Sequence, residues 1–500
     1  MNAPAIAVDD GVSRFLRDKA FIEGSWCGSA SGQRFPVSNP ADGTLLAELP
    51  RMGRADTARA IEAAERALPG WSGRTAGERA KILRRWADLM MENQEALARL
   101  LTLEQGKPVA ESRAEVAYAA SFFEWFAEEG KRAYGDIIPP FRPDNRILVT
   151  KQPVGVTVGI TPWNFPSAMP TRKAAPALAA GCTMVLKPAE QTPLSALAIC
   201  VLAEEAGVPP GVFNVVTGSE HDAPQIGQEM TSNPKVRKLG FTGSTEVGKL
   251  LMRQCADQLK KISLELGGNA PFIVFDDADP KTVMDALIMC KWRNTGQTCI
   301  SANRILVQSG IYNEIRDRLV AVAEELKVGN GLDPDVKQGP LIERAALEKV
   351  ERHVSDAQFR GAKVATGGRR HRLGHTFFEP TVLLDVDPTM AMSCEETFGP
   401  VAGLIRFDTE DEAIRIANDS RFGLGSSVWT HDGDEREAFI AELETGQVFV
   451  NAMVASDPRL PFGGVKESGY GRELGAWGIR EFVNAQTVYI GGGSGSSETE

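Results

Sequence analysis

A cysteine with polar neighbours is the first residue whose setting suggests chemistry. Cys299 lies in NTGQTCISANR (294–304), directly before the apolar run ILV. A structural cysteine usually sits among apolar side chains, where its thiol is inert, whereas a thiolate in a polar loop is a nucleophile. Loops on a rigid scaffold often carry functional residues. Cys299 is therefore a candidate nucleophile, and an inert loop cysteine is the alternative.

Two other short segments carry groups that suit a reaction at a carbonyl carbon. Asn164, in TPWNFP (161–166), is a carboxamide between two aromatic residues, and such an amide can donate a hydrogen bond to a developing oxyanion. Glu265, in LELGG (264–268), is a carboxylate at the expected end of a strand and can act as a general base. For the first segment, a loop stabilised by buried aromatic side chains is the alternative.

A glycine turn that opens a helix predicts a phosphate site, although the chain has no GxGxxG motif. In FTGSTEVGK (241–249), we expect a strand to end at Phe241 and a helix to begin near Ser244, with Gly243 in the turn. The free N–H groups and the positive dipole end of such a helix attract phosphate. An ordinary helix start is the alternative.

One strand end is a candidate ribose site. In MVLKPAE (184–190), Lys187 and Glu190 follow the carboxyl end of a predicted strand, the edge at which α/β sheets bind ligands. Lysine can donate to ribose hydroxyls and a carboxylate can accept from them. A solvated strand end is the alternative. A later segment, EETFGP, offers the carboxylate of Glu396 and the ring of Phe398.

The elements that must position these residues follow from hydrophobic periodicity. Residues 55–130 have apolar side chains at three- and four-residue spacing, which predicts helices. From residue 153, β-branched runs alternate with helix-like segments, and a second series of such runs extends from PFIVFD (271–276) to GQVFVN (446–451). This alternation predicts two α/β domains with parallel sheets.

Composition and charge exclude several classes of function. The 500 residues have a net charge of −11, which argues against a nucleic-acid or anionic-membrane surface. No apolar run reaches the roughly 18 residues of a membrane span, and the first residues do not read as a signal peptide. The 7 cysteines form no disulfide framework and the 5 histidines predict no metal site. We therefore expect a cytoplasmic protein without a metal centre.

Together, a thiol, an amide donor, a carboxylate and a nucleotide-type βαβ array suit the oxidation of a carbonyl through a covalent thioester. From about residue 20 to 490 the chain resembles the aldehyde dehydrogenase superfamily, through these segments in order: TPWNFP, LKPAEQTP, FTGSTEVGK, LELGGNAPFIVFDDAD, NTGQTC, EETFGP and PFGGVKESGYGRE. Within that superfamily it most resembles the succinate-semialdehyde dehydrogenases, through WNFPSAMPTRKAAPALAAGCTMVLKPAEQTP and RNTGQTC.

The resemblance implies an α/β fold with three parts. A Rossmann-like NAD(P)-binding domain would span 1–133 and 152–263, and an α/β catalytic domain 264–460. A small β flap at 134–151 and 480–492 would join copies into a homodimer or homotetramer. The Gly/Ser-rich end, 493–500, is expected to be a disordered tail.

The resemblance also implies a role for each candidate residue. Cys299 would attack the aldehyde, the Asn164 side chain and the backbone N–H of Cys299 would hold the oxyanion, and Glu265 would activate the water that hydrolyses the thioester. Lys187 and Glu396 would hold the riboses, with Ser244 at the pyrophosphate. The full set of expected cofactor-binding residues is Trp163, Lys187, Glu190, Gly243, Ser244, Glu396 and Phe398.

An acidic aldehyde is the expected substrate, and succinate semialdehyde is the first choice. Arg172, Arg293 and Ser456 match the residues with which similar enzymes hold the substrate carboxylate, and Arg459 is a possible addition. Arginine reads carboxylates well because its planar fork donates in pairs. Structural ion pairs are the alternative role for Arg172 and Arg293.

NAD is the preferred cofactor, with NADP as the alternative. Many similar enzymes that use NADP have a small polar residue where this chain has Glu190, and a carboxylate there would repel a 2′-phosphate. Three rival functions remain open: oxidation of glutarate semialdehyde or a broad range of aldehydes, a cofactor-independent cysteine hydrolase, and a non-catalytic protein on this fold.

Overall fold

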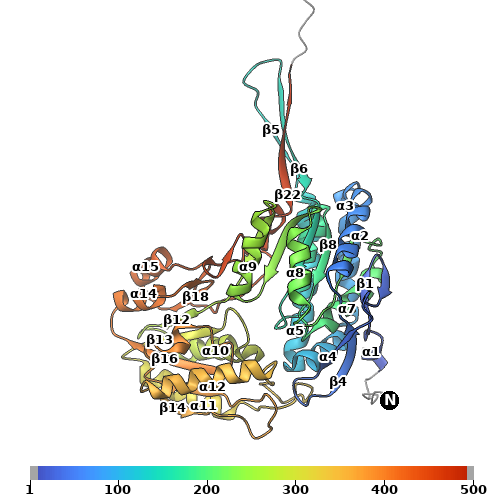
Figure 1. Ribbon diagram of the computed structural model, residues 1–500. Coiled ribbons are helices and arrows are strands. Elements are labelled where there is room, and N and C mark those ends of the chain that lie inside the picture. The colour runs from blue at the N-terminus through green and yellow to red at the C-terminus, as the bar shows by residue number, and fades with distance from the viewer. Residues whose placement is uncertain (1–9, 492–500) are drawn as a thin grey trace, which may run out of the picture.

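The computed structural model describes residues 10–491, which form two large sheets, a protruding three-stranded sheet and the helices that cover them (Figure 1). The expected α/β class with mostly parallel strands is confirmed. The tail predicted to be disordered, 493–500, lies outside the described residues, as do residues 1–9.

The first large sheet has the strand order β2-β1-β9-β8-β7-β10-β11-β21. Its central strands are parallel: β9 (Phe213–Val215), β8 (Thr183–Lys187), β7 (Val156–Ile160), β10 (Val236–Thr242) and β11 (Lys261–Glu265). Helices connect them in the βαβ manner: α6 (Ala168–Ala180), α7 (Pro193–Glu205), α8 (Ala223–Ser232) and α9 (Thr245–Ala256). The edge strands are antiparallel: β1 (Ala20–Ile22), β2 (Ser25–Cys27) and β21 (Gly469–Tyr470). Burial of both faces explains the β-branched runs.

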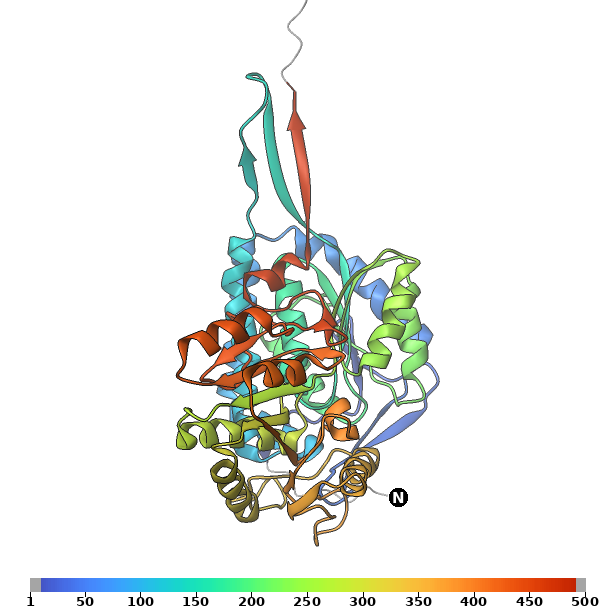
Figure 2. The ribbon, with the colours of Figure 1, turned by 90° about the vertical axis from the view of Figure 1, so that its left-hand side faces the viewer.

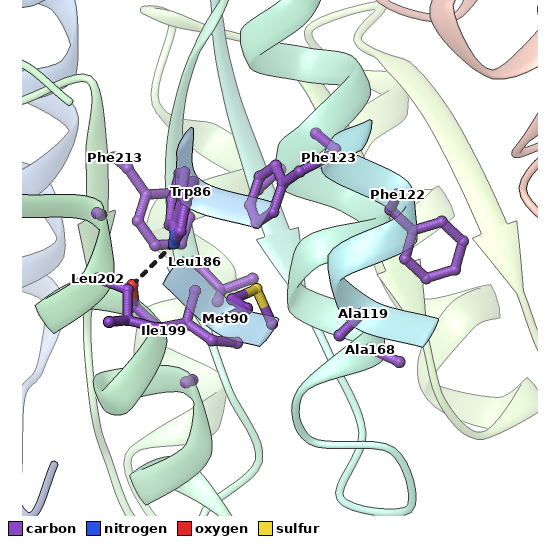
Figure 3. Close-up of a cluster of buried hydrophobic side chains, with 14 of the residues drawn as sticks. Trp86, Met90, Ala119, Phe122, Phe123, Ala168, Leu186, Ile199, Leu202 and Phe213 are labelled. Carbon is purple, nitrogen blue, oxygen red and sulfur yellow. Dashed lines mark hydrogen bonds between the residues drawn. The ribbon is translucent and has the colours of Figure 1, made fainter. Parts of the chain in front are cut away.

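Four helices precede the parallel strands of this sheet in the chain: α2 (Arg54–Ser72), α3 (Ala76–Glu92), α4 (Gln94–Gln105) and α5 (Val109–Glu129). Figure 3 shows part of the core that α3 and α5 share with α6 and α7. There Trp86 stacks on Phe123 with ring centroids 4.2 Å apart, and its indole N–H donates to the carbonyl of Ile199 at 3.2 Å. This packing fixes α5, whose other face borders the site.

The second large sheet has the strand order β14-β15-β16-β13-β12-β18-β19. All but the first of these strands are parallel: β15 (Thr381–Leu384), β16 (Val401–Phe407), β13 (Ala302–Gln308), β12 (Ala270–Val274), β18 (Ser426–Trp429) and β19 (Val448–Val450). The antiparallel edge strand is β14 (Lys363–Thr366). Its helices are α10 (Pro280–Trp292), α11 (Tyr312–Glu325), α12 (Arg344–Phe359), α14 (Glu410–Asn418) and α15 (Gly433–Glu442).

The remaining elements are short. They are α1 (Asp10–Ser13), β3 (Arg34–Ser38), β4 (Leu45–Pro50), the 3-10 turns at Gly130–Arg132 and Arg293–Gly296, α13 (Ala391–Cys394), β17 (Phe422–Gly423), β20 (Val465–Lys466) and α16 (Gly475–Arg480).

A three-stranded antiparallel sheet projects from the body of the molecule (Figures 1 and 2). Its strands are β5 (Asp136–Ile138), β6 (Arg146–Pro153) and β22 (Val483–Ile490). We call this sheet the arm. It exposes apolar side chains, with Ile137 84% and Phe141 75% exposed. Within the described residues, no helix is long and apolar enough to cross a membrane.

Candidate active site

A cavity of about 830 Å³ lies between the two large sheets. The carboxyl ends of β7, β10 and β11 open onto it from the first sheet, and the segments that lead into β13 and β16 line it from the second. Apart from Lys187, Glu190 and the possible addition Arg459, its wall includes every predicted site residue, namely Trp163, Asn164, Arg172, Gly243, Ser244, Glu265, Arg293, Cys299, Glu396, Phe398 and Ser456.

The loop that carries Cys299 turns sharply just before the thiol. Asn294, Thr295 and Gly296 have positive φ angles of 52°, 60° and 73°. Glycine adopts this conformation freely, whereas at Asn294 and Thr295 it is locally strained. A distant contact holds the turn, because Gln105 at the end of α4 donates its side-chain N–H to Asn294 Oδ1 at 2.9 Å.

Hydrogen bonds join the Cys299 loop to the Asn164 loop. Asn294 Nδ2 donates to the backbone oxygens of Asn164 at 3.0 Å and Gln297 at 3.2 Å. Asn164 Nδ2 also donates to the Gln297 oxygen at 3.2 Å, which fixes the orientation of its amide because the reverse would oppose two oxygens. One hydrogen of Asn164 Nδ2 remains for another acceptor in the cavity.

A buried ion pair between Lys107 and Glu115, which was not predicted from the sequence, holds the backbone of Asn164. Lys107 Nζ contacts Glu115 Oε2 at 2.6 Å and donates to the backbone oxygen of Asn164 at 2.7 Å. The other oxygen of Glu115 accepts from the N–H groups of Ser167 and Ala168, where α6 begins. Little in the sequence indicates this pair: Lys107 follows Gly106, the glycine that ends α4, and Glu115 lies in the next helix, α5.

Glu265 ends β11 and is 4% exposed, with no hydrogen-bond partner for its Oε2. Burial and the charge of Glu473 raise the pKa of Glu265 well above its ordinary value. Burial acts on Glu473 as well, but Lys173 at 2.8 Å and Arg172 at 2.6 Å outweigh it and lower the pKa of Glu473. Glu473 therefore stays charged, while Glu265 can exchange a proton near neutral pH, as a general base must.

The Glu265 segment meets the Cys299 loop through a glycine. A Cβ on Gly268 would lie 2.1 Å from the Cys299 carbonyl oxygen, so no larger residue fits between them.

Burial, with the carboxylates of Glu396 and Glu265, raises the pKa of Cys299 to about 12. The thiol is thus protonated at neutral pH in this structure, and the thiolate must form as part of the reaction.

Two arginines on the cavity wall have donor atoms without a partner. Arg172 Nε contacts Glu473, and its Nη1 donates to Ser456 Oγ at 3.4 Å, but its buried Nη2 has no partner. The buried Nε of Arg293 has none either, and the Arg293 guanidinium lies 5.7 Å from the Phe165 ring centroid. Arg172 therefore makes a structural ion pair, one of the two roles considered from the sequence, and keeps one unpartnered nitrogen that is available for the other.

The structure does not support Arg459 as an addition to this pair. Its side chain is 72% exposed and bound to Asp457 at 2.7 Å, and it does not line the cavity. Arg459 and Asp457 lie two positions apart in one loop, so this ion pair orders only a short stretch of chain and is favoured over a contact with a distant group.

The predicted phosphate turn is present at the amino end of α9. Ser244 caps the helix, with its Oγ accepting from the Val247 N–H at 3.3 Å, and α9 begins at Thr245 as expected. A Cβ on Gly243 would lie 2.5 Å from the Phe241 ring, so a larger residue at the turn would force that ring to move. The remaining N–H groups of the first helical turn are free to bind an anion.

Lys187 and Glu190 lie together at the carboxyl end of β8, away from the cavity wall. Lys187 Nζ contacts Glu190 Oε2 at 3.1 Å and donates to the Pro188 oxygen at 3.3 Å. In the sheet, β7 alone separates β8 from β10, the strand that leads to Ser244. The pair thus lies on the same sheet edge as the phosphate turn.

A second carboxylate and two aromatic rings complete the cavity. Glu396 Oε1 accepts from the Gly268 N–H at 2.9 Å, and burial raises the pKa of Glu396 to about 7. Trp163 and Phe398 meet edge to face, with ring centroids 5.4 Å apart. An anion site, two groups that can bind hydroxyls and an aromatic wall fit a nicotinamide dinucleotide.

Comparisons with known proteins identify the family of this chain. The model of the "Aldehyde dehydrogenase family" matches residues 26–488. The chain is 55% identical over 480 residues to a glutarate-semialdehyde dehydrogenase of Pseudomonas aeruginosa, covering 96% of this chain and 99% of that protein. It is 54% identical to the NADP(+) succinate-semialdehyde dehydrogenase of Escherichia coli, with the same two coverages, 96% and 99%.

A solved structure gives the same answer for the fold. The crystal structure of a succinate-semialdehyde dehydrogenase from Burkholderia pseudomallei superposes with a TM-score of 0.94 at 53% identity, over 95% of this chain and 98% of that one. The match of the family model to residues 26–488, together with relatives more than 50% identical over nearly the whole chain, leads to one conclusion: this chain belongs to the aldehyde dehydrogenase family.

Proposed function

We propose that this protein oxidises succinate semialdehyde to succinate, with NAD(P) as the hydride acceptor. The observation that carries this choice is the pair of buried, unpartnered arginine atoms, Arg172 Nη2 and Arg293 Nε, on the wall that also holds Cys299. Burying a donor or a charge without a partner is costly, so such atoms favour an anionic ligand. The two similar enzymes are named for glutarate semialdehyde and succinate semialdehyde, which supports an aldehyde with a carboxylate as the substrate of this protein.

The first half of the reaction joins the substrate to the enzyme. Cys299 gives its proton to water, and its sulfur adds to the aldehyde carbon to form a thiohemiacetal with a negative oxygen. The free hydrogen of Asn164 Nδ2 and the backbone N–H of Cys299 stabilise that oxygen. One such donor is typically worth about 10²–10³ in rate. Lys107 contributes indirectly, because it holds the Asn164 backbone in place.

The second half releases the acid. When bound, the oxidised nicotinamide ring supplies an acceptor for the hydride that leaves the thiohemiacetal carbon. Glu265 then takes a proton from water, and the resulting hydroxide adds to the thioester carbon and displaces the Cys299 sulfur. In total, one aldehyde, one oxidised dinucleotide and one water give one carboxylate, one reduced dinucleotide and two protons.

NAD is the proposed preference over NADP. The carboxylate of Glu190 lies beside Lys187 on the sheet edge that leads to the phosphate turn. A carboxylate there accepts from a ribose 2′-hydroxyl and opposes a 2′-phosphate. The ion pair with Lys187 weakens that opposition, and the similar Escherichia coli enzyme is named for NADP(+). The expected discrimination is therefore modest.

The assembly and the division into domains are part of the same proposal. The arm, with exposed Ile137 and Phe141, would bury apolar surface against a second copy and give a homodimer or homotetramer. The cofactor domain would comprise 1–133 and 152–263, the catalytic domain 264–460, and the oligomerisation flap 134–151 and 480–492.

Glutarate semialdehyde is the second candidate substrate, favoured by the 55% identity to the Pseudomonas aeruginosa enzyme. A cofactor-independent hydrolase has less support, because no histidine of the described residues lines the cavity. The test is a panel of succinate semialdehyde, glutarate semialdehyde and butanal, each with NAD and with NADP, followed at 340 nm. We expect kcat/KM at least tenfold higher for succinate semialdehyde than for butanal. Equal values for the two would refute an acidic substrate.

A further inference from the structure

We propose that Tyr118 is a specificity-determining residue, whose hydroxyl orients Ser456 so that Ser456 donates its hydrogen to the carboxylate of the substrate. The inference rests on the function proposed above and adds to it the means by which the carboxylate is recognised. Tyr118 lies on α5 and Ser456 in the loop between β19 and β20, and both line the cavity that holds Cys299.

The contacts of Ser456 fill its capacity to accept hydrogen bonds. Tyr118 Oη donates to Ser456 Oγ at 2.5 Å, and Arg172 Nη1 donates to the same oxygen at 3.4 Å. A hydroxyl oxygen has two acceptor positions, so both are taken. The hydrogen of Ser456 must therefore point to a third group, and its hydroxyl makes no further hydrogen bond among residues 10–491.

The same conclusion follows from a count of hydrogens. Two hydroxyl groups carry two hydrogens, and the short contact between Tyr118 and Ser456 uses one of them. Burial raises the pKa of Tyr118, so its phenol keeps its hydrogen at neutral pH. One hydroxyl hydrogen is left over on the cavity wall, and with the contacts seen here it belongs to Ser456.

The neighbouring arginine supplies the second donor. Arg172 Nη1 contacts Ser456, and the buried Nη2 of the same guanidinium has no partner. Glu473 holds this guanidinium through Nε at 2.6 Å, which fixes its plane. The wall thus holds the Ser456 hydroxyl next to a guanidinium that still has one unpartnered nitrogen, Nη2. Two fixed donors match the two oxygens of a carboxylate, which only accepts, and they offer nothing to a group that must donate.

The tyrosine ring has a separate, structural role. It packs on Phe122, with ring centroids 4.6 Å apart. Phenylalanine at position 118 would keep this contact and remove only the hydroxyl. In that variant the lone pair of Ser456 Oγ that accepted from the Tyr118 hydroxyl becomes free. The Ser456 hydroxyl can then rotate and point that lone pair, instead of its hydrogen, toward the substrate. Its hydrogen is then no longer committed to the carboxylate.

The test compares Tyr118→Phe with wild type on succinate semialdehyde and butanal. Tyr118→Phe removes the orientation of a hydrogen bond to a charged group but leaves its donor in place, so it should raise KM for succinate semialdehyde about three- to tenfold, less than complete loss of such a bond would. The kcat for that substrate and both constants for butanal should stay within twofold. Tyr312→Phe is the matched control, because Tyr312 is a buried tyrosine that does not line the cavity. It should change no constant by more than twofold.

A double-variant cycle separates an action through Ser456 from a direct or structural one. Ser456→Ala should also raise KM for succinate semialdehyde selectively, and adding Tyr118→Phe to it should change KM by less than twofold. The inference is wrong if Tyr118→Phe weakens butanal equally, if it lowers kcat alone, or if its effect persists unchanged in Ser456→Ala. The wild-type ratio between the two aldehydes tests the proposed function separately, and a lack of preference there would overturn both.

Discussion

Replacing Arg293 with alanine removes one of the two cavity-lining arginines that have a buried, unpartnered nitrogen. Arg293 makes no ion pair among the described residues, and its buried Nε has no acceptor, so its charge is available to a ligand. A charge-assisted hydrogen bond is worth about 1.5–3 kcal/mol, which corresponds to about 10- to 150-fold in affinity. We therefore expect KM for succinate semialdehyde to rise at least tenfold in Arg293→Ala.

The assay is steady-state formation of the reduced cofactor at 340 nm, with succinate semialdehyde and butanal run side by side. Butanal has no carboxylate, so its constants should stay within about twofold. Arg293→Lys should fall between the two forms, because lysine keeps the charge but lacks the planar fork. Arg459→Ala is the matched control, since this arginine is exposed and bound to Asp457 outside the cavity. It should behave as wild type.

Arg172 provides the contrast. Arg172→Ala would remove a donor and also one of the two cations that hold Glu473, whose charge acts on Glu265. We expect losses on both aldehydes there, whereas Arg293→Ala should affect the acidic one alone. Equal losses on both substrates in Arg293→Ala would mean that Arg293 is structural, and the assignment of an acidic substrate would lose its main support.

Three further predictions concern the chemistry and the cofactor. Cys299→Ala should fold and bind NAD, as measured by fluorescence titration, but lose dehydrogenase and any esterase activity; near-normal turnover would sink the mechanism. Glu265→Gln should release one equivalent of reduced cofactor in a burst and then stall, and failure of single-turnover hydride transfer would give Glu265 another role. In the wild type, deacylation should slow as the pH falls through the raised pKa of Glu265, because only the carboxylate can take a proton from water. Glu190→Ser should improve kcat/KM with NADP relative to NAD several-fold, since it removes a negative charge and frees Lys187 for a 2′-phosphate; an unchanged ratio would place Glu190 away from the ribose.

Much of the site could be predicted from short segments. The turn at Gly243, the cap at Ser244 and the start of α9 follow from local sequence, because glycine freedom and helix capping act over a few residues. The alternation of strands and helices predicted the mostly parallel sheets in the same way. Cys299 and Asn164 were found because polar groups in unusual surroundings are visible within each segment.

Other features depend on contacts between segments far apart in the chain. Glu473 lies 301 positions from Arg172. Nothing in its local sequence indicates that its own pKa is lowered or that its charge raises the pKa of Glu265. The support of Asn164 by Lys107 spans 57 positions. Arg459 had the right residue type in a promising loop, yet its nearest carboxylate, on Asp457, already binds it.

The sequence by itself thus determined the elements and most of the reactive groups, since backbone conformation and residue type are set by neighbours along the chain. The tertiary structure decided which groups are charged, which donors remain free and which residues support others. Those properties depend on burial and on distances between ionised groups, and both exist only once the two sheets have packed around the cavity.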